Sequence, residues 1–161
     1  MKNIIVTCFF VLMQLGILVH AQTNTTTDIY QKSQDGYACF RIPAIVKSKA
    51  GTLLAFAEAR KNSCSDTGNI DLVVKRSEDG GKTWSRTITV WDDGDNVCGN
   101  PSPIVDQETG RIILVSCWNL GEDHEKQIID KTSKDSRRVY VLYSDNDGKS
   151  WSTPKEITSS V

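Results

Sequence analysis

The chain has 161 residues, a formal net charge of −1 and 39% apolar residues. This composition suits one globular domain or part of a larger one, and the chain is not basic enough to suggest nucleic-acid binding. Only the N-terminal stretch is apolar over a length that approaches a membrane span, and it is short for one.

The N-terminus has the pattern of a secretory signal peptide. Lys2 supplies a positive charge, the apolar stretch runs from Ile4 to Val19, and Val19-His20-Ala21 provides the small residues required before cleavage. We expect residues 1–21 to be removed and the protein to be exported to the periplasm, the cell surface or the medium, without stable membrane insertion. The polar residues 22–34 predict a flexible lead-in. An uncleaved anchor is the alternative.

Short apolar and β-branched runs follow in two similar groups, separated by turn-forming segments. The first group is predicted at 42–47, 53–60, 70–76 and 87–91, and the second at 103–106, 112–118, 138–144 and 155–157. The second group contains an additional polar loop over 119–137. No long stretch has the 3.6-residue period of an amphipathic helix, so the pattern predicts an all-β domain over 35–161.

A similar octapeptide occurs at the same place in each group. Ser77-Glu78-Asp79-Gly80-Gly81-Lys82-Thr83-Trp84 follows the third run, and Ser144-Asp145-Asn146-Asp147-Gly148-Lys149-Ser150-Trp151 follows the seventh. In such a turn the Asp, Ser and Thr side chains bind backbone N–H groups, a Gly supplies positive φ and the Trp covers the hairpin. The second copy has Asn146 in place of Asp79, and Asp147 is the candidate to replace that carboxylate.

The repetition indicates stacked sheets of similar structure. Tandem four-stranded antiparallel units are typical of β-propeller blades, and ~4–8 blades close a propeller. The sequence accounts for about two of them. We therefore predict a partial β-propeller that forms the N-terminal part of a longer protein.

The cysteines leave their pairing open. Cys8 lies in the expected signal peptide, which leaves Cys39, Cys64, Cys98 and Cys117. Export permits oxidation, but four cysteines allow three pairings, and the sequence does not choose among these or free thiols. The spacing does not match a zinc site, and we expect neither a metal nor an organic cofactor.

Polar residues from separate segments are expected to meet at one end of the two units. Alternate connections of a blade face the same end, which places Arg41, Arg60 and Asp66 on one rim, opposite the repeated turns. Asn100 and Trp118 belong to the same rim. Each residue alone fits an ordinary surface ion pair, turn cap or packing role, but the group together indicates a site.

The motif Phe40-Arg41-Ile42-Pro43, the later Arg60 and Asp66, and the repeated turns (Asp boxes) resemble the sialidases, also called neuraminidases or exo-α-sialidases, in order and approximate spacing. The resemblance covers about Tyr37 to Ile157 and implies two blades of a six-bladed catalytic propeller. Asp boxes also occur in propellers with other functions, so the two arginines and the Asp carry the assignment.

The resemblance implies specific roles. Arg41 is the first of three arginines that bind the sialic acid carboxylate, and Asp66 is the acid/base that protonates the leaving oxygen and then activates water. Arg60 and Asn100 are expected near the O4 hydroxyl, and Trp118 beside the N-acetyl group. Sialidases use a Tyr nucleophile paired with a Glu, and we expect these beyond residue 161 with the other two arginines.

The sequence thus predicts an exported exo-α-sialidase, a retaining glycoside hydrolase that removes terminal sialic acid from glycoproteins, glycolipids and oligosaccharides. The piece as given is expected to be inactive without the nucleophile. An acid such as Asp66 requires local desolvation to stay protonated at working pH. Arg137 is not assigned to the carboxylate site. The alternatives are a non-catalytic sialic-acid-binding propeller and a structural propeller that binds protein partners.

Overall fold

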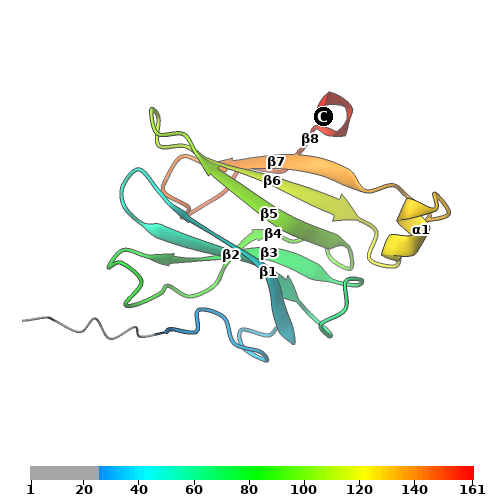
Figure 1. Ribbon diagram of the computed structural model, residues 1–161, viewed down its shortest axis with the longest axis horizontal. Helices are drawn as coiled ribbons and strands as arrows, with labels where there is room; N and C mark the ends of the chain where they lie inside the picture. Colours follow the sequence, from blue (N-terminus) through cyan, green and yellow to red (C-terminus); the bar gives the residue numbers. More distant parts are fainter. Residues whose placement is uncertain (1–25) are drawn as a thin grey trace, which may run out of the picture.

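The structure is a computed structural model that describes residues 26–161 (Figure 1). The expected signal peptide and the start of the lead-in lie outside the described residues. The elements, in chain order, are β1 (Cys39–Lys47), β2 (Leu53–Arg60), β3 (Ile70–Ser77), β4 (Ile88–Trp91), β5 (Val97–Val105), β6 (Ile112–Asn119), α1 (Glu125–Ile129), β7 (Arg138–Ser144), β8 (Lys155–Glu156) and the 3₁₀ turn Thr158–Ser160. Within residues 26–161, no helix has the length and apolar character needed to cross a membrane.

The strands form two antiparallel meanders, β1–β4 (blade 1) and β5–β8 (blade 2). A parallel pairing of Ile70 with Val97 connects the blades, and the sheet order runs from β1 to β8 without closing. The all-β partial propeller expected from the sequence is therefore confirmed.

Strand β2 is buried on both faces, which explains its nearly continuous apolar sequence. Leu54 and Phe56 face blade 2, where they join a core cluster with Leu114 and Leu142. Ala57 and Ala59 face the other way and pack under the segment before β1. Because side chains alternate along a strand, Glu58 and Arg60 continue the face of Leu54 and Phe56. The two charged residues therefore lie at one end of the interface between the blades.

The first strand of each blade contains the same kind of bulge. Register shifts occur between Arg41 and Ala44 in β1 and between Gly99 and Ser102 in β5. Ile42 and Asn100 adopt left-handed φ values of 52° and 54°, and a proline follows each. Proline cannot donate to a strand ladder, so a bulge is the place in a sheet that accepts it. Strand β5 consequently begins at Val97, six residues before the predicted start, because Pro101 had indicated a loop.

The first repeated turn has the expected geometry. Asp79 accepts hydrogen bonds from the backbone N–H and the hydroxyl of Thr83, at 2.9 and 2.6 Å, and from the Ser77 hydroxyl at 2.8 Å. The Trp84 indole donates to the Gly81 carbonyl at 3.2 Å.

The second turn corrects the expectation for Asp147. Asn146 itself takes the place of Asp79, because its Oδ1 accepts the Ser150 N–H at 2.9 Å and the Ser144 hydroxyl at 3.0 Å. The amide oxygen supplies the same acceptor as a carboxylate, so the turn needs no second acid. Asp147 instead points to blade 1, where its carboxylate accepts from Thr52 and from Arg76 at 3.0 Å.

Candidate active site

A cavity of about 210 Å³ lies at the end of the interface between the two blades. Blade 1 contributes the β1 bulge, the end of β2, the β2–β3 loop and the start of β3. Blade 2 contributes the start and bulge of β5, the end of β6 and the 120–137 loop. Its charged and amide-bearing lining residues are Glu58, Arg60, Asp66, Asn100, Asn119, Glu125 and Arg137. Of the residues predicted for the rim, Arg60, Asp66 and Asn100 line this cavity, whereas Arg41 and Trp118 do not.

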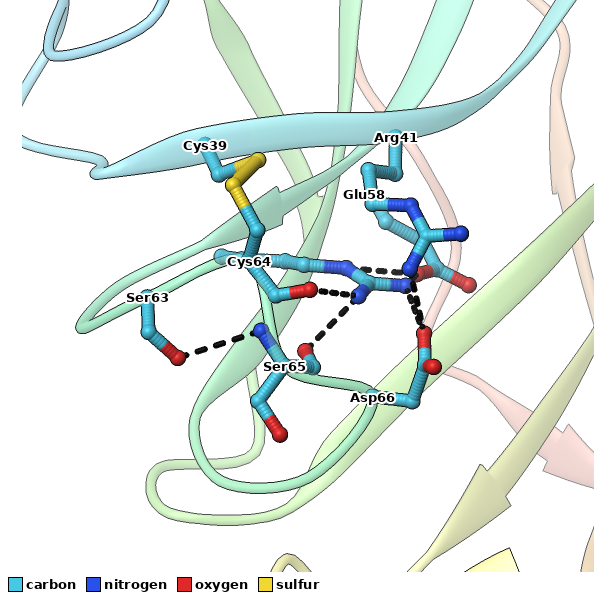
Figure 2. The surroundings of a disulfide bond; sticks show 8 residues. Cys39, Arg41, Glu58, Ser63, Cys64, Ser65 and Asp66 are labelled. Atoms are coloured by element: carbon cyan, nitrogen blue, oxygen red, sulfur yellow. Dashed lines mark hydrogen bonds and ion pairs between the residues drawn. A yellow bond between two sulfur atoms is a disulfide. The ribbon is translucent and has the colours of Figure 1, made fainter.

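Arg41 and Asp66 point toward one another, as the strand connections predicted. Arg41 Nη1 donates to Asp66 Oδ1 at 2.9 Å, and Arg60 Nη2 lies 2.7 Å from the same oxygen (Figure 2). The Arg60 side chain is 3% exposed, whereas Arg41 is 45% and Asp66 71% exposed. One carboxylate oxygen is thus shared by a buried and an accessible guanidinium.

The Arg60 guanidinium donates four hydrogen bonds to protein acceptors and forms an ion pair with Asp66. Nε and Nη2 donate to Glu58 Oε2 at 3.2 and 2.6 Å, and Nη1 donates to the carbonyls of Cys64 and Ser65, each at 2.7 Å. Nη2 also forms the ion pair with Asp66 Oδ1 at 2.7 Å. Four of the five N–H donors are therefore used within the protein, and these contacts hold the Arg60 side chain in position.

Sequence reasoning missed Glu58. This 4% exposed carboxylate binds Arg60 through Oε2 and accepts the backbone N–H of Asn100 at 2.9 Å through Oε1. A Cβ atom at Gly99 would lie 2.7 Å from Oε1, so the glycine allows this approach. Glu58 therefore joins the two blades at the cavity. The sequence did contain a signal for Glu58, which is a single acid within the apolar run of β2. A charge buried in such a strand requires partners, so this residue could have been expected to form an ion pair or hydrogen bonds.

Asn100 lines the cavity as predicted, but Trp118 does not. Trp118 is 8% exposed, packs in the core cluster and donates its indole N–H to Asp93 Oδ2 at 2.7 Å. The next residue, Asn119, faces the cavity instead. Alternation along β6 turns these neighbours to opposite faces, so an error of one position exchanges a cavity residue for a core residue.

The loop between β6 and β7 adds residues that the sequence left unassigned. Figure 1 shows α1 beyond the end of β6, and Glu125 of this helix lines the cavity. Arg137 lines it from the other end of the loop and donates to Asn119 Oδ1 at 3.3 Å. Within residues 26–161 no carboxylate forms an ion pair with Arg137, so its charge acts on the cavity.

The charge environment keeps Asp66 ionised. The hydrogen bond from Arg60 lowers the pKa of Asp66 below its usual value, and the charges of Arg60, Arg41 and Arg137 add to this effect, while the small burial opposes it. In this state of the site, the desolvation that an acid such as Asp66 requires to stay protonated is outweighed by the neighbouring arginines. Protonation requires a change in its partners, which a ligand could supply.

A disulfide joins Cys39, at the start of β1, to Cys64 in the loop that carries Asp66 (Figure 2). This settles the pairing that the sequence left open, and Cys98 and Cys117 are free thiols. Among the described residues, no group of three or more His, Cys, Asp or Glu side chains is arranged to hold a metal ion. The polar groups that line the cavity are guanidinium, carboxylate and amide groups.

Comparisons with known proteins agree with this arrangement. Residues 51–161 match the BNR repeat-like domain family. The chain is 33% identical to an exo-alpha-sialidase of Aspergillus fumigatus, across 78% of this chain and 35% of that protein, and 33% identical to a sialidase of Bacteroides fragilis, across 79% and 26%. The solved structure of the Hadza microbial sialidase Hz136 superposes with a TM-score of 0.69 at 29% identity, across 78% of this chain and 27% of that one.

The chain spans about a third or less of the length of these relatives. The family match begins after β1 and extends over the other strands of both blades to residue 161. This chain belongs to the sialidase family of BNR repeat proteins.

Proposed function

We propose that this chain forms part of an exported exo-α-sialidase, a retaining hydrolase that releases terminal α-linked sialic acid from glycoconjugates. The observation that carries the proposal is the shared Asp66 oxygen, which lies 2.9 Å from Arg41 and 2.7 Å from Arg60 at the mouth of the cavity. An accessible guanidinium next to a carboxylic acid suits a substrate whose carboxylate lies close to its scissile bond. The Tyr nucleophile, its Glu partner and two further arginines are expected in other blades.

Binding of the substrate would change the protonation of Asp66. A sialic acid carboxylate that binds the exposed Arg41 replaces Asp66 as its partner and brings a negative charge near. Loss of a cation and gain of an anion both raise the pKa of a neighbouring carboxyl group. The acid that the reaction needs is then formed by the substrate itself, although Asp66 is ionised before binding.

The test is Asp66→Asn in the full-length protein. We expect kcat for sialyllactose to fall by about 100-fold or more, because general acid–base groups contribute 10²- to 10⁴-fold. The affinity for the sialic acid glycal inhibitor should remain within about threefold, because Arg41 still binds its carboxylate. Unchanged turnover of Asp66→Asn would refute the role of this acid. NMR of the first-formed anomer tests retention.

A non-catalytic sialic-acid-binding propeller is the second candidate, and the exposed, ionised state of Asp66 favours it. In that case the wild-type protein binds the glycal without any turnover, and Asp66→Asn changes nothing but affinity. We also propose that residues 22–161 alone are inactive, so release of a fluorogenic sialoside by this piece would contradict the expected place of the nucleophile.

A further inference from the structure

We propose that the Cys39–Cys64 disulfide is a positioning device, which keeps Asp66 at the cavity while Arg41 exchanges Asp66 for a ligand. The inference rests on the proposed function. Its structural basis is that the same two segments are linked twice. The disulfide joins Cys39 to Cys64, and the ion pair joins Arg41 to Asp66 two residues further along in each segment.

The two links are side by side. Cys39 and Arg41 are two apart in β1, so both side chains leave the same face of the strand, as Figure 2 shows. Cys39 pairs in register with Arg60, and Arg41 pairs with Glu58. The loop thus approaches β1 directly above the ion-pair network of Arg60 and Glu58.

Backbone hydrogen bonds hold this loop only near its ends, where Lys61 donates to Asn69 and Gly68 donates to Gly121. Residues 61–66 are exposed, and residues 62–67 form no backbone–backbone hydrogen bond. The carbonyls of Cys64 and Ser65 are held by Arg60 alone. Exposed loops with few buried contacts open at low cost in free energy.

The two links differ in how they respond to a ligand. A carboxylate ligand competes for Arg41 and breaks the ion pair, but it leaves the covalent bond intact. The disulfide then limits the movement of Asp66, and with it the carbonyls that orient Arg60. Without the disulfide, the loop would be freest in the complex, where the position of Asp66 matters.

The experiment compares the wild-type full-length protein with Cys39→Ser/Cys64→Ser. We expect kcat to fall about 10- to 100-fold in the variant, because small misplacements of a reacting group have effects of this size. The loss should be larger for sialyllactose than for 4-nitrophenyl sialoside, because only the poor leaving group requires a well-placed acid. Hydrogen exchange of residues 61–69 should rise most when the glycal inhibitor is bound.

Cys98→Ala is the matched control. Cys98 is fully buried in the core, so its truncation lowers the melting temperature without touching the loop, and kcat should be unchanged. If the double variant does not fold, a phosphine reductant applied to the native wild type provides the same comparison, since Cys64 is exposed. Reoxidation should restore the rate.

Equal kcat losses for both substrates, or unchanged exchange in the loop, would reduce the disulfide to a stabilising cross-link and overturn the proposal. A wild-type protein without turnover would instead refute the proposed function. In that event, hydrogen exchange of residues 61–69 in the glycal complex still tests the positioning role of the disulfide. Exchange that is unchanged after reduction of the disulfide would refute this role, and increased exchange would support it.

Discussion

Arg60 illustrates how a single side chain can organise a site without facing solvent. Its guanidinium donates to Glu58 and to two loop carbonyls, forms an ion pair with Asp66, and is 3% exposed. A buried guanidinium is stable only when its charge is compensated, and Glu58 is the buried partner that does so. The position of Asp66 therefore depends on Glu58, a carboxylate for which no role was predicted.

Glu58→Gln should lower the free energy of unfolding by about 3 kcal/mol, because it removes one partner of a buried ion pair. Activity of the full-length protein should fall by at least about tenfold, since Arg60 no longer fixes the Asp66 loop. Urea unfolding and steady-state kinetics measure these effects.

Glu78→Gln is the matched control for that substitution. Glu78 also pairs with an arginine, but its side chain is 67% exposed, so the change should stay within about 0.5 kcal/mol. Equal losses of stability in the two variants would contradict the importance of the buried pair.

The residues that could be placed from the sequence lie in segments whose end of the sheet is determined by the strand connections. Arg41 and Asp66 meet as predicted because the strand connections determine the end of the sheet to which each belongs. Trp118 was wrongly placed, since its side depends on the exact register of β6, and Asn119 occupies the cavity instead. Glu58 acts through a contact with the Asn100 backbone in the other blade, which no local pattern reveals.

At the scale of the element, the second repeated turn does more than close a hairpin. Asp147 accepts from Thr52 and Arg76 of blade 1, and its carbonyl accepts Arg76 Nε at 2.7 Å. Burial, the largest influence, raises the pKa of Asp147, but hydrogen bonds from Ser48, Thr52 and Arg76 outweigh it and leave the pKa below the usual value. The turn thus links the two blades through a charge.

Asp147→Asn should reduce the free energy of unfolding by about 1–3 kcal/mol at pH 7, since it weakens a charge-assisted contact. Asn keeps the left-handed φ of 64° at low cost. The folded pKa is depressed, so the stabilisation is complete above the unfolded value of about 3.9 and is lost as the pH falls through the folded pKa.

The difference between wild type and Asp147→Asn should therefore shrink when urea unfolding is repeated toward pH 3. Asp145→Asn, in the same turn but 56% exposed, serves as the control and should have an effect within about 0.5 kcal/mol. A difference that stays constant with pH would show that the charge is not involved.

The strands could largely be predicted because the alternation of apolar residues gave their length and order. Strands β2 and β7 have the bounds expected from the sequence. Strand β5 did not, because the bulge at Asn100 and Pro101 resembles a loop until its pairing across Gly99 and Ser102 is seen. Helix α1 has five residues, too few for a recognisable period.

At the scale of the whole molecule, the rim loops of both blades meet at Gly121. Its carbonyl accepts the N–H of Gly68, in the Asp66 loop, at 2.7 Å, and its own N–H donates to Asn96 Oδ1 at 3.3 Å. An added Cβ would lie 1.8 Å from the Asp95 carbonyl oxygen. Blade 2 therefore supports the Asp66 loop through a close backbone contact.

Gly121→Ala should destabilise the protein by about 2 kcal/mol, because the backbone must move to admit the methyl group. Activity of the full-length protein should also fall, since the Asp66 loop loses its support. Thermal unfolding and kinetics are the measurements. Ser136→Ala, an exposed position in the same long loop, should change stability by less than about 0.5 kcal/mol. An equally small effect of Gly121→Ala would contradict the tight contact.

The strand order has a practical outcome for anyone who expresses this region by itself. Among residues 26–161, strand β1 ends the order with one side unpaired, and Ile45 on it is 57% exposed. Such a margin recruits a second chain by edge-to-edge pairing. We therefore expect self-association, rather than failure to fold, to limit the concentration at which the isolated pair of blades stays in solution. A lysine in place of Ile45 is the simplest remedy, because a charge at that margin repels its own copy.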